Sequence, residues 1–157
     1  MRTHVDPGDV RHAVAVLNDL IQLEYDTMAA YRAAIDRIDS MLVRRELAQF
    51  FADHEAHTRT LSTCVERYGG RAKTGGDLKQ LWTRGRVILA DLAGDDAVLA
   101  ALKRLESNVH RAYERAQTEL RYVGDPPLAA AFDGALAEED HHVLWLVHAV
   151  DGPVKPA

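Results

Sequence analysis

Two glutamates lie within helical stripes that are otherwise apolar. Glu24 is followed seven residues later by Tyr31, and Glu106 is followed seven residues later by Tyr113. A carboxylate buried on a helix face is costly to desolvate unless a cation or a polar partner compensates it. The repeated pattern therefore predicts helices that pack around a shared charged centre.

Apolar residues recur at intervals of three and four along most of the chain, which is the periodicity of an amphipathic helix. A chain of 157 residues is most simply one domain, so residues 1–157 are expected to form a single all-α unit. Asp125 precedes two prolines and is predicted to cap the last helix. The predicted helices span residues 9–38, 40–68, 78–93, 95–123 and 126–150.

Composition excludes several classes of function. The net charge is −5, and acidic and basic residues alternate without a Lys/Arg cluster, so nucleic acid is not an expected partner. No apolar run approaches the roughly 18 residues that span a bilayer, so no membrane location is expected. Cys64 is the only cysteine, and the first residues lack the apolar core of a signal peptide. We therefore expect a cytoplasmic protein without an internal disulfide.

Polar residues occupy the centres of several predicted helix faces. At 100° per residue, Glu24, His54 and Glu139 each lie at the middle of an apolar stripe. His57 and His142 each follow a central residue by three positions and lie about 60° to the same side of it. The pairs His54-x-x-His57 and Glu139-x-x-His142 thus have the same geometry on two different helices.

The two halves of the chain align weakly with each other. Glu106 lies about 60° from the apolar residue three positions later, so its inward orientation rests mainly on the repeat. Asp53 and Glu138 fall 100° or more from the centre of their faces and are expected to be solvated. Tyr31 and Tyr113 are expected to be ordinary core residues, with a hydrogen bond to a ligand or electron transfer near the site as the alternatives. A twofold pattern of this kind is what a shared metal site would produce.

The connectivity also indicates a particular bundle. Two long helices, a crossover of about 25 residues and two more long helices match ferritin-like bundles, although other helical bundles remain an alternative. The polar residues resemble those of carboxylate-bridged di-metal proteins such as bacterioferritin and rubrerythrin, which use Glu, Glu-x-x-His, Glu and Glu-x-x-His on four successive helices. The stretch from Leu81 to Ala116 also resembles an uncharacterised bacterial family of ferritin-like four-helix bundles.

The resemblance assigns a role to each polar residue. Glu24 and Glu106 correspond to terminal carboxylate ligands, and Glu139 corresponds to a bridging carboxylate. His57 and His142 correspond to imidazole ligands. The departure is His54, which stands where the family pattern has the other bridging glutamate. The implied ligand set suits one or two iron ions, with manganese or zinc as alternatives. The predicted metal ligands are Glu24, His54, His57, Glu106, Glu139 and His142.

The resemblance further implies a function. It indicates a metal-binding protein, most simply an iron protein, with ferroxidase activity or reactivity toward O₂ or peroxide. The enzyme class would then be a non-haem iron oxidoreductase. The alternative is a non-catalytic scaffold or binding protein whose metal site is structural or vestigial. A monomer or homodimer is expected, because the sequence has no short fifth helix resembling that of many cage-forming ferritins.

Overall fold

The computed structural model of the chain describes residues 6–76 and 78–152. Every regular element in the described residues is helical, which confirms the all-α prediction, including the extra helix in the crossover. None of these helices is long and apolar enough to cross a membrane. The elements are α1 (Pro7–Arg37), α2 (Met41–Arg67), α3 (Leu78–Ile88), α4 (Gly94–Glu119), the single-turn 3₁₀ helix η1 (Arg121–Val123) and α5 (Pro126–Asp151).

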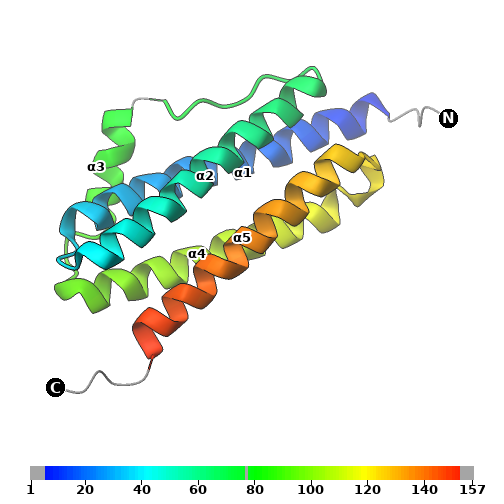
Figure 1. Cartoon of the computed structure of the whole chain (residues 1–157). Coiled ribbons are helices and arrows are strands. Elements are labelled where there is room, and N and C mark those ends of the chain that lie inside the picture. The colour runs from blue at the N-terminus through cyan, green and yellow to red at the C-terminus, as the bar shows by residue number, and fades with distance from the viewer. Residues whose placement is uncertain (1–5, 77, 153–157) are drawn as a thin grey trace.

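The helices form two antiparallel hairpins that pack on each other (Figure 1). One hairpin is α1 with α2, and the other is α4 with α5. The segments 68–76 and 78–93 lie along the outside of the first hairpin, and α2 and α4 run in the same direction (Figure 1). Within this crossover, α3 packs against α1. This is the ferritin-like connectivity that the sequence predicts.

Short polar contacts set where the first two helices begin. The Asp6 carboxylate accepts a hydrogen bond from the Gly8 amide at 2.6 Å, and the Ser40 hydroxyl accepts one from the Val43 amide at 3.4 Å. Each contact satisfies an amide that has no partner within the helix. At the other end of α2, Gly69 has φ of 73°, a left-handed conformation that glycine adopts without strain.

Asp125 occupies the N-cap position of α5, but its side chain does not cap the helix. The carboxylate instead contacts the Arg67 guanidinium at 3.1 Å and accepts a hydrogen bond from the Tyr68 hydroxyl at 2.7 Å. Both partners stand at the C-terminal end of α2. Asp125 therefore joins the two hairpins at this end of the bundle.

The crossover helix is shorter than predicted, because α3 ends at Ile88 and turns follow. The Arg37 guanidinium at the end of α1 donates to the carbonyl oxygens of Leu89 and Leu92. These contacts satisfy carbonyl groups that a longer helix would have bonded internally. The fourth predicted helix also differs, because α4 ends at Glu119 before η1.

Gly85 allows α3 to approach α1 closely. A Cβ atom built on Gly85 would lie 2.2 Å from the Ala29 carbonyl oxygen, which is part of the α1 backbone. Because backbone atoms of a packed helix cannot move aside independently, any larger residue at this position must push the two helices apart.

We expect Gly85→Ala to lower the free energy of unfolding by about 1 to 3 kcal/mol, the usual range for overpacking. Gly134→Ala is the matched control, since a Cβ at Gly134 in α5 meets no atom within 4 Å. The control is expected to stabilise the protein by up to about 1 kcal/mol through helix propensity. Urea unfolding followed by circular dichroism measures both, and equal effects would contradict the close approach of α3.

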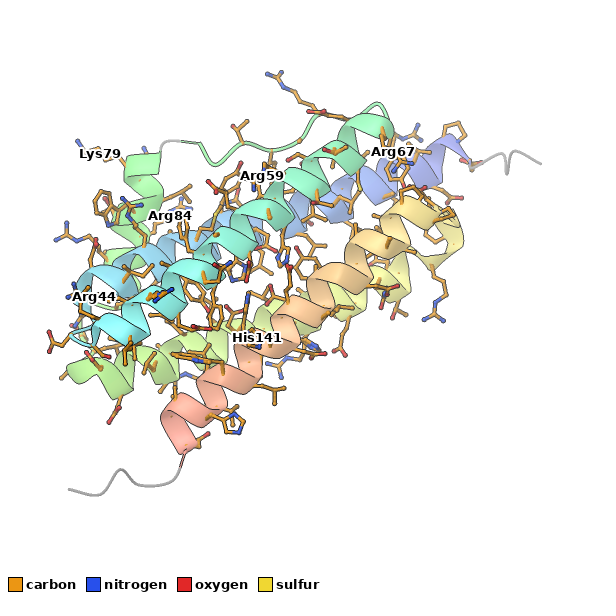
Figure 2. All side chains as sticks on the ribbon, in the orientation of Figure 1. Arg44, Arg59, Arg67, Lys79, Arg84 and His141 are labelled. Carbon is orange, nitrogen blue, oxygen red and sulfur yellow. The ribbon has the colours of Figure 1, made fainter. Side chains whose placement is uncertain are left out.

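The bundle interior consists of two apolar clusters with a polar layer between them. Polar side chains such as Arg59, Arg84 and His141 lie on the outside (Figure 2). The first cluster lies toward the end that holds η1 and includes Leu17, Ile21, Leu61, Val65, Val109, Tyr113, Leu128 and Phe132. The second lies toward the opposite end and includes Tyr31, Ile38, Leu47, Phe50, Val98, Leu102 and Leu146.

Candidate metal centre

The polar layer contains all six residues that the sequence singles out. Each of the long helices contributes to it, and the side chains converge on the bundle axis. Five of the six residues have no exposed surface, and His57 is 6% exposed. Buried acidic and imidazole groups at this density are unusual unless they are paired or bind a metal. The six are Glu24 from α1, His54 and His57 from α2, Glu106 from α4, and Glu139 and His142 from α5.

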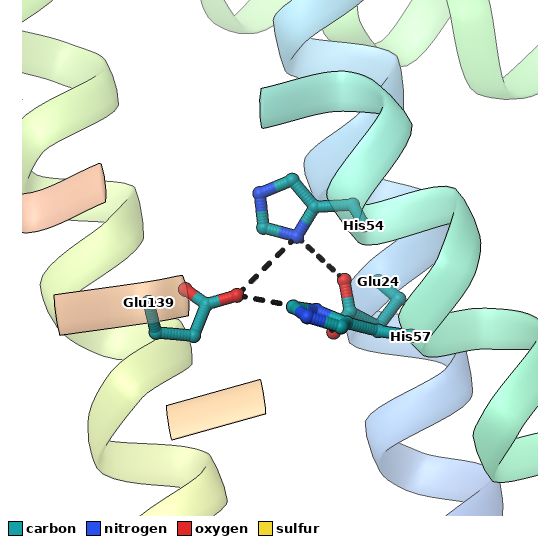
Figure 3. A group of neighbouring side chains, drawn as sticks. All are labelled: Glu24, His54, His57 and Glu139. Carbon is teal, nitrogen blue, oxygen red and sulfur yellow. Dashed lines mark hydrogen bonds and ion pairs between the residues drawn. The ribbon is translucent and has the colours of Figure 1, made fainter. Parts of the chain in front are cut away.

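The six residues form two overlapping groups of four, which we name lobe A and lobe B. In each lobe, one ligand atom from each residue lies within 4.8 Å of the other three. Figure 3 shows lobe A, with the side chains of α1, α2 and α5 pointing toward one another. Lobe A contains Glu24, His54, His57 and Glu139, and lobe B contains His54, Glu106, Glu139 and His142.

His54 and Glu139 belong to both lobes. The His54 ring places Nδ1 2.7 Å from Glu24 Oε2 in lobe A and Nε2 3.0 Å from Glu106 Oε1 in lobe B. Glu139 Oε1 lies 3.5 Å from His54 Nδ1 and also 3.5 Å from His57 Nδ1. These two residues thus occupy the two shared positions that bridging carboxylates take in the family pattern.

Two carboxylates outside the six residues support the imidazoles. His57 Nε2 lies 2.6 Å from Glu138 Oε2, and His142 Nε2 lies 2.9 Å from Asp53 Oδ2. The prediction that Asp53 and Glu138 are only solvated is therefore wrong, although Glu138 remains half-exposed. Each contact fixes a ring so that its Nδ1 atom faces the centre, which is the usual role of a carboxylate behind a metal-binding histidine.

The two tyrosines also reach the centre, and they do so crosswise. Tyr31 on α1 donates a hydrogen bond to Glu106 on α4, while Tyr113 on α4 donates one to Glu24 on α1. Both hydroxyls are buried, and both acceptors are carboxylates of the centre. The expectation of ordinary core tyrosines is thus replaced by its first alternative, a hydrogen bond to each candidate ligand. The sequence does not show which glutamate each tyrosine contacts, because each tyrosine bonds the glutamate of the other helix.

We expect Tyr31→Phe and Tyr113→Phe each to lower the free energy of unfolding of the metal-free protein by about 1.5 to 3 kcal/mol, the range for hydrogen bonds to charged groups. Tyr122→Phe is the control, because the Tyr122 hydroxyl is exposed and donates to a neutral carbonyl of Asp9 at 3.1 Å. Its expected effect stays within about 0.5 kcal/mol. Chemical unfolding in the presence of a chelator measures all three, and an effect no larger than that of the control would contradict the buried hydrogen bonds.

The carboxylates and imidazoles of the centre set each other's charge in the metal-free protein. Burial alone would raise the pKa of Glu24 and of Glu106, but His54 and the neighbouring imidazoles outweigh it and lower both values to about 2. Burial alone would lower the pKa of His57, but Glu139 and Glu24 raise it to about 10. The pKa of His54 is raised as well, despite burial, by Glu24 and Glu106. Two carboxylates are therefore balanced by two imidazoliums.

Glu139 and His142 are neutral in this arrangement. Burial raises the pKa of Glu139 to about 9, the charge of Glu106 acts in the same direction, and the nearby imidazole of His57 opposes both. Burial also lowers the pKa of His142. The polar layer thus carries no net charge at neutral pH, which explains how six ionisable groups can share an apolar interior.

Several atoms of the centre nevertheless have no hydrogen-bond partner. They are Glu106 Oε2, both carboxyl oxygens of Glu139, and His142 Nδ1. Metal–ligand bonds of about 2.1 Å place the ligand atoms of one ion roughly 3 to 4 Å apart. The ligand atoms of each lobe lie within 4.8 Å of one another, so small side-chain movements would let them surround an ion. Oxygen and nitrogen donors in this ratio suit iron, manganese or zinc. The residues present therefore fit a metal ion.

The helix order, the long crossover and the buried layer of carboxylates and histidines define a ferritin-like helical bundle. The chain belongs to the family described as a domain of unknown function (DUF2383), whose model matches residues 12–119. That match covers most of α1 and all of α2, α3 and α4, but it stops before α5. No curated protein matches the chain.

Solved structures show the same fold. One, from Bacillus anthracis, is described as ferritin like, diiron-carboxylate proteins; it has a TM-score of 0.73 and 14% identity, covering 94% of this chain and 99% of that one. A second, from Xanthomonas campestris pv. campestris, has a TM-score of 0.79 and 16% identity, covering 91% of each chain. The predicted ferritin-like fold is confirmed by these likenesses.

Proposed function

We propose that this protein binds iron in the polar layer and that the bound iron reacts with O₂ or peroxide. The observation that carries the proposal is a set of four buried atoms that could bind a metal and that have no hydrogen-bond partner. They belong to Glu106, Glu139 and His142. Leaving such atoms without partners is costly unless a ligand completes them. The likeness to the Bacillus anthracis structure, whose description names diiron-carboxylate proteins, supports iron over other metals.

The chain's own residues hold and shield the site. Glu24 and Glu106 supply negative charge, and Glu139 does so once it loses its proton. His142 supplies a neutral nitrogen ligand, and His57 does so once it loses its proton. Iron(II), when bound by these residues, would supply electrons to an oxidant such as O₂ or peroxide. The two apolar clusters on either side exclude bulk water, which strengthens each carboxylate–metal interaction. Open coordination positions would admit a small oxidant to the metal.

A second function is favoured by one observation. His54 stands in a bridging position, where an imidazole replaces the negative charge that a carboxylate would supply. This replacement favours a non-catalytic scaffold in which a metal ion, for example zinc, only stabilises the bundle. The same six residues would hold the ion, so metal content alone does not separate the two functions.

Glu139→Gln is the sharpest test of metal binding. Because the carboxyl of Glu139 is protonated in the metal-free protein, a neutral amide of the same shape is expected to leave the fold intact. The same change removes the carboxylate that both lobes share. We expect iron bound per chain to fall to background, measured by mass spectrometry of metals after purification from iron-supplied cells. Glu55→Gln, an exposed position on α2, is the control and should retain full metal content.

Oxygen consumption separates the two functions. On addition of iron(II) to the metal-free protein, an O₂-reactive centre is expected to consume O₂ faster than buffer alone, and Glu139→Gln is expected to remove the excess rate. Full metal binding without any excess consumption of O₂ or peroxide would support the scaffold instead. If the wild-type protein binds no more metal than Glu139→Gln does, both proposed functions are refuted.

A further inference from the structure

His54 cannot serve both lobes in the way that a bridging glutamate does. A carboxylate offers two oxygens that can bind two ions at once, whereas a neutral imidazole has one free lone pair and one N–H group. The two ring nitrogens of His54 face different lobes, with Nδ1 toward Glu24 and Nε2 toward Glu106. When one nitrogen binds an ion, the other is left to donate its hydrogen to the carboxylate it faces.

The two lobes also differ in how many of their ligand atoms already have a hydrogen-bond partner. In lobe A, both oxygens of Glu24 and both nitrogens of His57 already have hydrogen-bond partners. In lobe B, Glu106 Oε2 and His142 Nδ1 have none. An ion in lobe A must displace the contacts between Glu24 and the two imidazoles of α2. An ion in lobe B displaces only the contact between His54 Nε2 and Glu106 Oε1, and it meets two ligand atoms that have no hydrogen-bond partner. The unpartnered oxygens of Glu139 serve either lobe.

Access to solvent distinguishes the lobes as well. A cavity of about 290 Å³ reaches His57 of lobe A and is bordered by Glu138 and Tyr113. His142 and Glu106 of lobe B have no exposed surface, and the carboxylate behind His142, Asp53, is 22% exposed against 52% for Glu138. Lobe B is thus the closed side of the centre, and lobe A is the side next to the cavity.

We propose that the protein holds one ion in lobe B, bound by Glu106, Glu139, His142 Nδ1 and His54 Nε2, and that His54 makes lobe A a much weaker second site. The inference rests on the metal binding proposed above. With an ion in lobe B, the His54 Nδ1–H group donates to Glu24 Oε2, so the ring itself holds lobe A in its hydrogen-bonded, metal-free form. The two lobes therefore compete for one imidazole.

Equilibrium dialysis against iron(II) without oxygen tests this proposal. The wild-type chain is expected to bind one ion, with a second at least 100-fold weaker. His54→Glu restores a carboxylate at the shared position and is expected to bind two ions whose affinities lie within about tenfold of each other. Two ions of similar affinity in the wild-type chain would overturn the proposal while leaving metal binding intact. Absence of any bound ion would refute the proposed function as well.

Two substitutions locate the first ion without relying on the folding of His54→Glu. Asp53→Asn weakens the support of His142 in lobe B, and Glu138→Gln weakens the support of His57 in lobe A. Loss of such a carboxylate typically lowers metal affinity about 10- to 100-fold. We expect Asp53→Asn to lower the affinity of the first ion by this amount and Glu138→Gln to change it less than twofold. A larger loss of affinity in Glu138→Gln than in Asp53→Asn would place the first ion in lobe A and contradict the proposal.

Discussion

Glu24→Ala is expected to lower the free energy of unfolding of the metal-free protein by about 3 to 5 kcal/mol, the range for removing one partner of a buried ion pair. Glu24 is fully buried and lies 2.7 Å from His54 Nδ1 and 3.2 Å from His57 Nδ1. Its removal leaves Nδ1 of each of these imidazoles and the Tyr113 hydroxyl without an acceptor, and one positive charge without its carboxylate. The loss exceeds that of a cavity alone, because charge is left uncompensated in an apolar interior.

Glu55→Ala is the matched control on a neighbouring helix. Glu55 is 56% exposed and pairs with Arg59 one turn away at 3.4 Å, so its loss is expected to change stability by no more than about 0.5 kcal/mol. Urea unfolding of both variants with chelator present gives the comparison. If Glu24→Ala proves as mild as Glu55→Ala, the charged network that we describe around Glu24 is not present in solution.

The metal-free protein is expected to lose stability as pH rises from about 6.5 to 10. His57 has a folded pKa of about 10, above its ordinary value of 6.5, so its contribution is complete below pH 6.5 and is lost as pH rises through 10. Glu139, with a folded pKa of about 9, acts in the same direction, because the unfolded chain ionises first. Glu24 and Glu106 have folded pKa values of about 2, so their contribution is present above pH 4.5 and is lost as pH falls toward 2.

Metal reverses the alkaline part of this profile. Binding requires the ligands to lose their protons, so metal affinity rises with pH, and the added stability rises with affinity. Unfolding measured between pH 6 and 9 is therefore expected to show a falling curve with chelator and a flatter or rising curve with saturating Zn²⁺, which avoids redox chemistry. A metal-free protein that becomes more stable toward pH 9 would show that the histidines are not held in their charged form.

The positions of the central residues were predictable from the sequence, because the helical period fixes how far a residue is turned from the apolar face. Glu24, His54 and Glu139 lie at the centres of their faces and at the centre of the bundle. Asp53 and Glu138 were mispredicted for a related reason. A residue 100° from the centre of a helix in a four-helix bundle faces the neighbouring helix, and both carboxylates meet a histidine there.

A helical wheel does not predict the crosswise hydrogen bonds between the tyrosines and the glutamates. A wheel gives the angle of Tyr31 about its own axis, but it does not give the height at which α4 passes or which of its turns lies opposite. The donor and acceptor roles of His54 likewise depend on where two other helices place their carboxylates. That residues 1–157 form one domain and that the protein is a monomer or homodimer stay predictions.

The exchange of tyrosine, carboxylate and histidine contacts between the hairpins fixes their register. In the first hairpin, Tyr31 and Asp53 form hydrogen bonds with Glu106 and His142 of the second. In the second hairpin, Tyr113 and Glu138 form hydrogen bonds with Glu24 and His57 of the first. The hydrophobic effect is not directional, but a slide of one helical turn, about 5.4 Å, would break all four polar contacts together. The polar layer thus specifies a single alignment of the two hairpins.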